Sequence, residues 1–236
     1  LEEHVHLRQK CETLVSEFDR AVDTPIIKLK KPSHSGEISI RMPERKSYCQ
    51  RSIATGRCAD IIDAPPEEIL AYLYDFCSRD RMRIHKEEGH PARLTLSDDG
   101  RQSLLATIKS VSWPLHNREF VTRTFWWKDE DSGTYYLANV SVGDVIDYGL
   151  SMKTVRASTI TLTKIEPFGE VGEDGKRHSR IEYTQFLDGG GFLPEWLVNS
   201  IVSNSLNVVQ SMRLVFRKDE DIDMAEKTRL LRILQN

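Results

Sequence analysis

The chain has 236 residues, of which 39% are hydrophobic, and its formal net charge is −3. This length supports one sizeable core or two small ones, and the balanced charge gives no case for nucleic-acid binding. No stretch approaches the roughly 18 apolar residues that span a bilayer, and no signal peptide is recognisable. We therefore expect a soluble protein, and because it begins with Leu1 rather than Met we expect a piece of a longer one.

A helical apolar stripe runs through residues 1–22, and the opposite face is charged. This pattern predicts an amphipathic helix packed on the surface of the main domain. Alternating runs at residues 26–30 and 37–42 predict half-buried strands, and residues 48–62 predict a longer strand.

A shorter helix is predicted over residues 63–77, because two prolines stand in its first turn and two glutamates follow at the positive end of its dipole. A basic segment follows it. Its cations have two open interpretations, attraction to an anionic membrane or an ordinary solvated helix face. They are Arg79, Arg81, Arg83 and Lys86.

Residues 92–187 are mostly strand, with turn signals at residues 98–100 and 131–133 and no long helix between the runs. Successive strands of this kind predict an antiparallel sheet. The final long helix, predicted over residues 195–217, has an apolar arc of about half its circumference. We expect an α+β fold in which a strongly curved antiparallel sheet wraps around this helix and leaves an internal cavity.

The expected divisions are an N-terminal helix over residues 1–22, a domain over residues 23–218 and a helical tail over residues 219–236. The cysteines show no CxxC spacing, so we expect buried free thiols in a reducing, cytoplasmic compartment. They are Cys11, Cys49, Cys58 and Cys77.

Three consecutive glycines, Gly189, Gly190 and Gly191, stand just before the final helix. A phosphate-cradling loop is one interpretation, but Pro194 removes an N–H that an anion at the helix start would need. A hinge for a moving helix and a simple tight turn both remain open.

No catalytic or metal motif emerges from the sequence. Residues 85–90 contain two histidines but do not form HExxH, and no GxSxG elbow is present. We expect no catalytic residue, no metal ion and no cofactor.

Residues 112–127, SWPLHNREFVTRTFWW, resemble a signature of the StAR-related lipid-transfer (START) family, in which a proline loop precedes an Arg-Asp-Phe-Val strand. Residues 139–142 are similar to the next family strand, and residues 155–167 to the one after it. Residues 188–199, DGGGFLPEWLVN, resemble the glycine-proline segment that opens the family's closing helix, and they are the most specific match. The resemblance covers residues 20–218.

The resemblance implies a helix-grip (Bet v 1-like) fold with a tunnel for a single lipid. Some members place a charged pair in that tunnel, where this chain has Leu105 and Thr124, so the lipid class stays open. The expected tunnel residues on strands are Leu105, Phe120, Thr122, Thr124 and Trp126. Those on the closing helix are Leu197, Ile201, Asn204, Val208 and Met212.

A membrane-facing gate is expected where the proline loop meets the closing helix, because tryptophan favours the bilayer interface. Trp113 either contacts membrane or packs on the closing helix, and Trp196 either contacts membrane or packs against the tail. For Arg118 we expect a structural role, with a head-group contact as the alternative. The gate residues are Trp113, Pro114, Gly189, Gly190, Gly191 and Trp196.

Three functions follow as hypotheses. The preferred one is binding and transfer of a single lipid during transient contact with a membrane surface, which implies a cytoplasmic protein with peripheral membrane contact. The second is a lipid-sensing or membrane-tethering module that works with other domains of the same chain. The third, an enzyme, lacks any nucleophile or acid–base pair that we can name.

Overall fold

The computed structural model describes residues 2–20, 26–28, 37–41, 53–169, 177–191, 193–194, 197, 201, 205–206, 208–216 and 221–234. The helices are α1 (Glu2–Arg20), α2 (Pro66–Tyr74), α3 (Arg79–Glu87), α5 (Val208–Val215) and α6 (Asp221–Leu234). The strands are β1 (Ile26–Lys28), β2 (Glu37–Arg41), β3 (Ile53–Ile62), β4 (Ala92–Asp98), β5 (Gln102–Lys109), β6 (Arg118–Lys128), β7 (Tyr135–Ser141), β8 (Val155–Arg156), β9 (Ser158–Phe168) and β10 (His178–Asp188).

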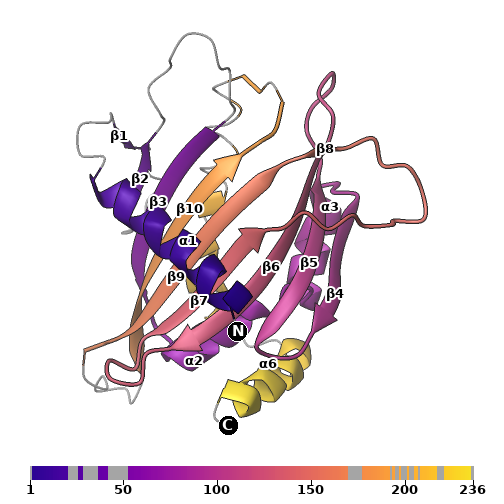
Figure 1. Cartoon of the computed structure of the whole chain (residues 1–236). Helices are drawn as coiled ribbons and strands as arrows, with labels where there is room; N and C mark the ends of the chain where they lie inside the picture. The colour runs from indigo at the N-terminus through magenta and orange to yellow at the C-terminus, as the bar shows by residue number, and fades with distance from the viewer. Residues whose placement is uncertain are drawn as a thin grey trace.

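The strands form a single curved sheet in the order β1-β2-β3-β10-β9-β7-β6-β5-β4 (Figure 1). All neighbours in this order are antiparallel, and only the short β8 pairs in parallel, with β6. The reason lies in the connections, because tight turns such as the one at Gly100, with φ of +85°, return the chain directly to the neighbouring strand. The predicted α+β class and antiparallel sheet are confirmed.

The basic segment after α2 folds as a helix of its own, α3. Ser78 caps it, since its hydroxyl accepts a hydrogen bond from the backbone N–H of Arg81 at 3.4 Å. The structured part of the predicted helix over residues 63–77 is correspondingly shorter, ending at Tyr74.

Helix α1 lies across the outer face of the sheet, over β7 and β9 (Figure 1). Leu7 and Cys11 point from one stripe of the helix into a small apolar cluster, because residues four apart share a helix face. The sheet contributes Phe125, Ala138, Val140 and Leu162 to this cluster. Near the end of the helix, the Asp19 carboxylate pairs with the Arg57 guanidinium at 2.6 Å.

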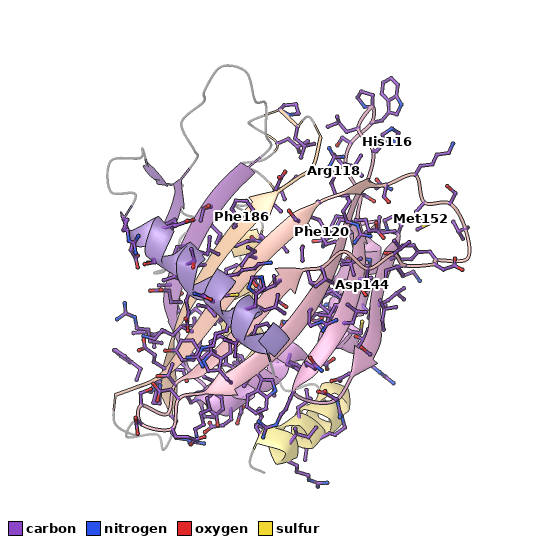
Figure 2. All side chains as sticks on the ribbon, in the orientation of Figure 1. His116, Arg118, Phe120, Asp144, Met152 and Phe186 are labelled. Atoms are coloured by element: carbon purple, nitrogen blue, oxygen red, sulfur yellow. The ribbon has the colours of Figure 1, made fainter. Side chains whose placement is uncertain are left out.

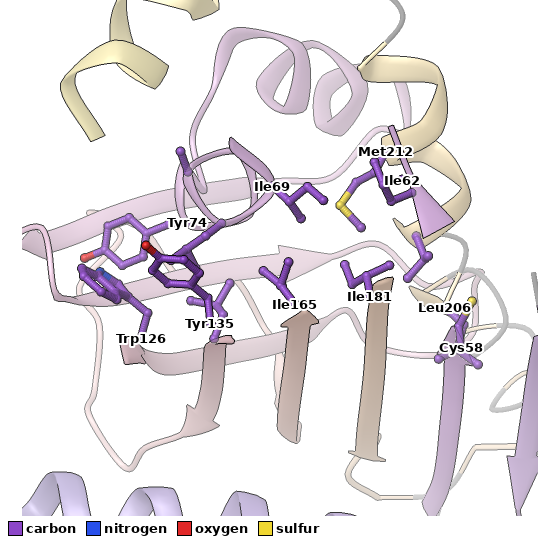
Figure 3. Close-up of a cluster of buried hydrophobic side chains, with 14 of the residues drawn as sticks. Cys58, Ile62, Ile69, Tyr74, Trp126, Tyr135, Ile165, Ile181, Leu206 and Met212 are labelled. Carbon is purple, nitrogen blue, oxygen red and sulfur yellow. The ribbon is translucent and has the colours of Figure 1, made fainter. Parts of the chain in front are cut away.

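The larger core lies on the inner face, between the sheet, α2 and α5 (Figure 3). Ile69 of α2 lies over Ile165 and Ile181 of the sheet, and Met212 reaches the same cluster from α5. All four side chains are fully buried.

Helix α6 lies at the α2 end of the molecule, where it contacts α2 (Figure 1). It packs closely on the β4–β5 turn: a Cβ on Gly100 would stand 2.9 Å from Cδ1 of Ile233. The positive φ favours glycine there, and any larger residue would also displace the Ile233 side chain. Within the described part of the chain, no helix is long and apolar enough to cross a bilayer.

Candidate functional site

Strand β6 carries four of the residues that the sequence predicts for a tunnel wall, and all four lie on the inner face. Phe120 and Trp126 belong to the inner core, and the two-residue period of a strand puts Thr122 and Thr124 on the same side. Leu105 pairs with Thr122 from β5, so it faces inward as well. The structure brings these five residues together, and their contact with lipid stays a prediction.

Five uncharged polar side chains form a line across the inner face, perpendicular to the strands. Each residue is the Cα partner of the next across β5, β6, β7, β9 and β10. We call this line the inner polar row: Ser103, Thr124, Asn139, Thr161 and Gln185. Only Thr124 was predicted as a site residue, because the alignment of the others depends on strand register.

Hydrogen bonds connect the central members of the inner polar row. The Thr124 hydroxyl donates to Oδ1 of Asn139 at 2.5 Å, and Nδ2 of Asn139 donates to Oγ1 of Thr161 at 2.7 Å. Nε2 of Gln185 donates to Oγ1 of Thr159 at 3.1 Å. Oε1 of Gln185 is buried, and no described residue donates to it. The β10 end of the row is therefore a buried acceptor whose partner is still to be found. At the β5 end, the buried Ser103 hydroxyl lies beside the Tyr74 hydroxyl but makes no hydrogen bond of good geometry with a described residue.

A hollow of about 30 Å³, which has room for little more than a water molecule, adjoins the β5 end of the inner polar row. Ser103 and Leu105 line it from the sheet, and Leu230 lines it from α6. Small-molecule sites typically occupy about 300–1,000 Å³, so this hollow alone is small. Phe120 and Tyr183, which also lie on the inner face, are half-buried rather than fully buried.

The Tyr183 hydroxyl lies where the sheet meets the closing helix. Burial raises the pKa of Tyr183 to about 12, and hydrogen bonding with the side chains of Ser205 and Thr161 opposes that rise. The hydroxyl thus stays protonated at neutral pH and adds a further neutral polar group beside the inner polar row.

The closing helix supplies the wall that faces the sheet. Leu197, Ile201 and Val208 are partly buried against the inner core, and Met212 is fully buried in it. The Arg213 guanidinium pairs with the buried Asp60 carboxylate of β3 at 3.3 Å, which holds this end of the helix on the sheet. Two predicted residues, Asn204 and Trp196, lie outside the described residues.

The loop that carries Trp113 and Pro114, here called the proline loop, lies at the end of the sheet away from α2 (Figures 1 and 2). Trp113 is 92% exposed and Pro114 is exposed too, so Trp113 does not pack on the closing helix. That interpretation of Trp113 is wrong, and membrane contact stays a prediction.

Arg118 joins this loop to the turn formed by Gly189, Gly190 and Gly191, here called the glycine turn. Its guanidinium donates to the carbonyl of Gly189 at 2.6 Å and of Gly190 at 3.4 Å, and it also donates to the carbonyl of His116. The expected structural role of Arg118, with backbone partners, is confirmed. Gly190 has φ of +66°, and a Cβ there would collide with the carbonyl oxygen of Arg156, so this position admits only glycine.

A second loop at the same end was missed from the sequence. Residues 142–154 carry two exposed apolar side chains, Val145 at 91% and Leu150 at 68%. Tyr148 connects the loop to the start of β6, because its hydroxyl donates to the Glu119 carboxylate at 2.8 Å. Asp144 and Met152 mark this loop in Figure 2. The signal in the sequence was apolar residues inside a polar, glycine-flanked loop.

The cations of α3 mostly have partners within the protein. Arg81 donates to the carbonyls of Leu73 and Asp75, and the exposed Arg83 pairs with Asp80 and Glu87. These contacts support the helix-face interpretation for Arg83. Arg81 is half-buried over the Tyr72 ring and fits neither interpretation. No group of three or more His, Cys, Asp or Glu side chains suited to a metal ion occurs within the described ranges.

The fold is shared with solved START domains. The lipid transfer and protein localization domain of human StarD13 matches with a TM-score of 0.58 and 18% identity over 85% of this chain and 94% of its own. A STAR-related lipid transfer protein fragment from Xanthomonas axonopodis matches with a TM-score of 0.61 and 17% identity, covering 82% and 99% of the two chains. Human STARD10 matches with a TM-score of 0.57 and 18% identity, covering 94% and 78%. No family model and no curated protein matches the chain.

Proposed function

We propose, from the START-type helix-grip fold, that this chain binds one lipid between the inner face of the sheet and the closing helix and transfers it between membranes. The observation that carries the proposal is the inner face itself. Phe120 and Tyr183 are not fully buried there, a small hollow adjoins Leu105, and solved lipid-transfer proteins have the same fold.

Enclosure solves an energetic problem for a lipid. Burying one CH₂ group is favourable by about 0.8 kcal/mol, so moving a sixteen-carbon chain into water costs about 13 kcal/mol of free energy. A protein that shelters the chain and opens only at a membrane removes that barrier. Trp113, Val145 and Leu150 are suited to the membrane contact, and the glycine turn to the opening movement.

The test is lipid extraction followed by transfer. Native mass spectrometry of protein purified from cells should reveal one bound lipid per chain, and the protein should move labelled lipid between donor and acceptor vesicles. Absence of both would refute the proposal.

A lipid-sensing or tethering module is the second candidate, and the exposed apolar loops support it equally. A sensor would bind lipid tightly and dock on vesicles while exchanging little lipid, so the transfer assay separates the two. We propose no catalytic activity, and steady turnover of an acyl thioester by the purified chain would contradict this.

A further inference from the structure

The inner polar row is the part of the interior that has chemistry beyond hydrophobic contact. It places five hydroxyl and amide side chains in one line, and four of them, all except Asn139, are buried. Buried polar groups are destabilising unless hydrogen-bonded, and each that is retained needs a partner.

The row has a specific hydrogen-bonding demand. Both ends of the Asn139 amide are engaged, by Thr124 and Thr161. Gln185 is only 6% exposed, its Nε2 is engaged by Thr159, and its Oε1 receives no hydrogen from any described residue. Oε1 is an acceptor, so the group that satisfies it must be a donor, and a hydroxyl on a bound molecule is one.

Fixed charge is scarce on this part of the inner face. Arg81 of α3 acts electrostatically on Tyr183, but its guanidinium already donates to the backbone carbonyls of Leu73 and Asp75. The described strand residues on either side of the row carry no charge: they are Leu105, Thr122, Ser141, Thr159 and Leu187 on one side, and Trp126, Leu137, Thr163 and Tyr183 on the other. Arg118 is six residues along β6 from Thr124, about 20 Å at the rise of a strand, and it is engaged by carbonyls. Where the row meets the hollow, Asp98 and Arg229 pair with each other at 3.6 Å.

A phosphate or carboxylate placed here would lose its water, and the donors of Thr124, Asn139 and Gln185 are already engaged within the protein. Such a group is strongly disfavoured without a counter-charge, whereas an uncharged hydroxyl both donates and accepts. We infer that the inner polar row selects a lipid with an uncharged, hydroxyl-bearing head group, of the diacylglycerol or sterol kind, and discriminates against lipids with a phosphate. This inference rests on the proposed lipid binding and names the ligand class of that site.

The test compares dioleoylglycerol with dioleoyl phosphatidic acid, which differ only at the head group, and adds cholesterol as a second neutral lipid. The full chain is incubated with phosphatidylcholine vesicles that contain labelled dioleoylglycerol, dioleoyl phosphatidic acid or cholesterol, and the lipid that leaves with the protein is counted. We expect at least about tenfold more dioleoylglycerol or cholesterol than phosphatidic acid, the effect of roughly one hydrogen bond or more. The two neutral arms distinguish an acylglycerol from a sterol.

The outcomes separate this inference from the function on which it rests. Extraction of phosphatidic acid or phosphatidylcholine at an equal or higher level would overturn the head-group inference and leave lipid binding intact. Extraction of no lipid would overturn both.

A variant locates the selectivity at Gln185. Gln185→Leu removes the acceptor, so affinity for dioleoylglycerol should fall about tenfold, while affinity for its 3-O-methyl ether, which lacks the donor, should not change. Gln102 lies on the outer face of β5, away from the inner polar row. Gln102→Leu makes the same chemical change there and should leave both affinities unchanged. Equal loss for both ligands in Gln185→Leu, or no loss for either, would overturn the assignment. If Gln185→Leu fails to fold, the same two ligands compared on the unaltered chain still decide whether the hydroxyl is recognised.

Discussion

Nε of Arg118 donates a hydrogen bond to the carbonyl oxygen of Gly189 at 2.6 Å, so the first residue of β6 holds the turn that leads into the closing helix. The same guanidinium bonds the carbonyls of His116 and Gly190. One buried side chain therefore connects the exposed proline loop to the glycine turn, the two segments at the expected gate.

Replacing Arg118 by lysine should destabilise the fold by roughly 1–3 kcal/mol, because a single ammonium cannot serve all three carbonyls and leaves at least one without a donor. Urea unfolding measures the change. Arg180→Lys, an exposed position on β10, is the matched control and should change stability by less than about 0.5 kcal/mol. Equal stability of Arg118→Lys and the parent would mean that the three bonds are not held in solution.

The glycine turn offers a comparison between neighbours. Gly190 and Gly191 both have positive φ, but only at Gly190 would a Cβ collide with the Arg156 carbonyl; at Gly191 the nearest atom is 4.0 Å away. Gly191→Ala should cost about 1–2 kcal/mol from backbone strain alone, and Gly190→Ala should cost clearly more. Thermal unfolding of the two variants checks the order. Similar losses would show that the turn relaxes away from Arg156.

Much of the fold was predictable from the sequence because it depends on local pattern. The stripe through Leu7 and Cys11 predicts α1, and the turn at Gly100 predicts the β4–β5 hairpin. The alternation in β6 predicted which of its residues share a face, and the match of the proline loop and glycine turn to START domains predicted the helix-grip fold.

The site was less accessible to the same reasoning. The inner polar row depends on register across five strands. The sequence pattern of any one strand does not predict that Thr124, Asn139 and Gln185 will align. Exposure of Val145 depends on how a loop without regular structure leaves the body. Contacts between distant segments decided both, so local patterns did not contain them.

Membrane docking should depend on the two exposed apolar loops. Trp113→Ser, combined with Val145→Ser and Leu150→Ser, should reduce binding to phosphatidylcholine vesicles at least about tenfold, because aromatic and aliphatic side chains drive partition into the interface. Stability should hardly change, since these side chains are mostly exposed. Sedimentation with vesicles measures the effect.

Phe168→Ser is the control for docking. Phe168 is also exposed, but it ends β9 at the opposite end of the sheet from the proline loop (Figure 1). Vesicle binding should survive this change. If Phe168→Ser weakens binding as much as the triple variant, the chain does not dock through its loop end.

Acid should destabilise the protein through His85. Burial, together with the positive charges of Lys109 and Arg93 and the neighbouring His90, lowers the pKa of His85 from 6.5 to about 4. Between these values the unfolded chain binds a proton that the folded chain does not, so the free energy of unfolding is fully retained above pH 6.5 and falls as the pH drops towards 4. The loss amounts to up to about 3 kcal/mol. His85→Phe keeps a ring against His90 and removes the proton site, so the fall across this window should become shallower in urea titrations at several pH values. A histidine signal that titrates near pH 6.5 in the folded protein, assigned to His85 by its disappearance in the variant, would show that the ring is hydrated and that the acid sensitivity arises elsewhere.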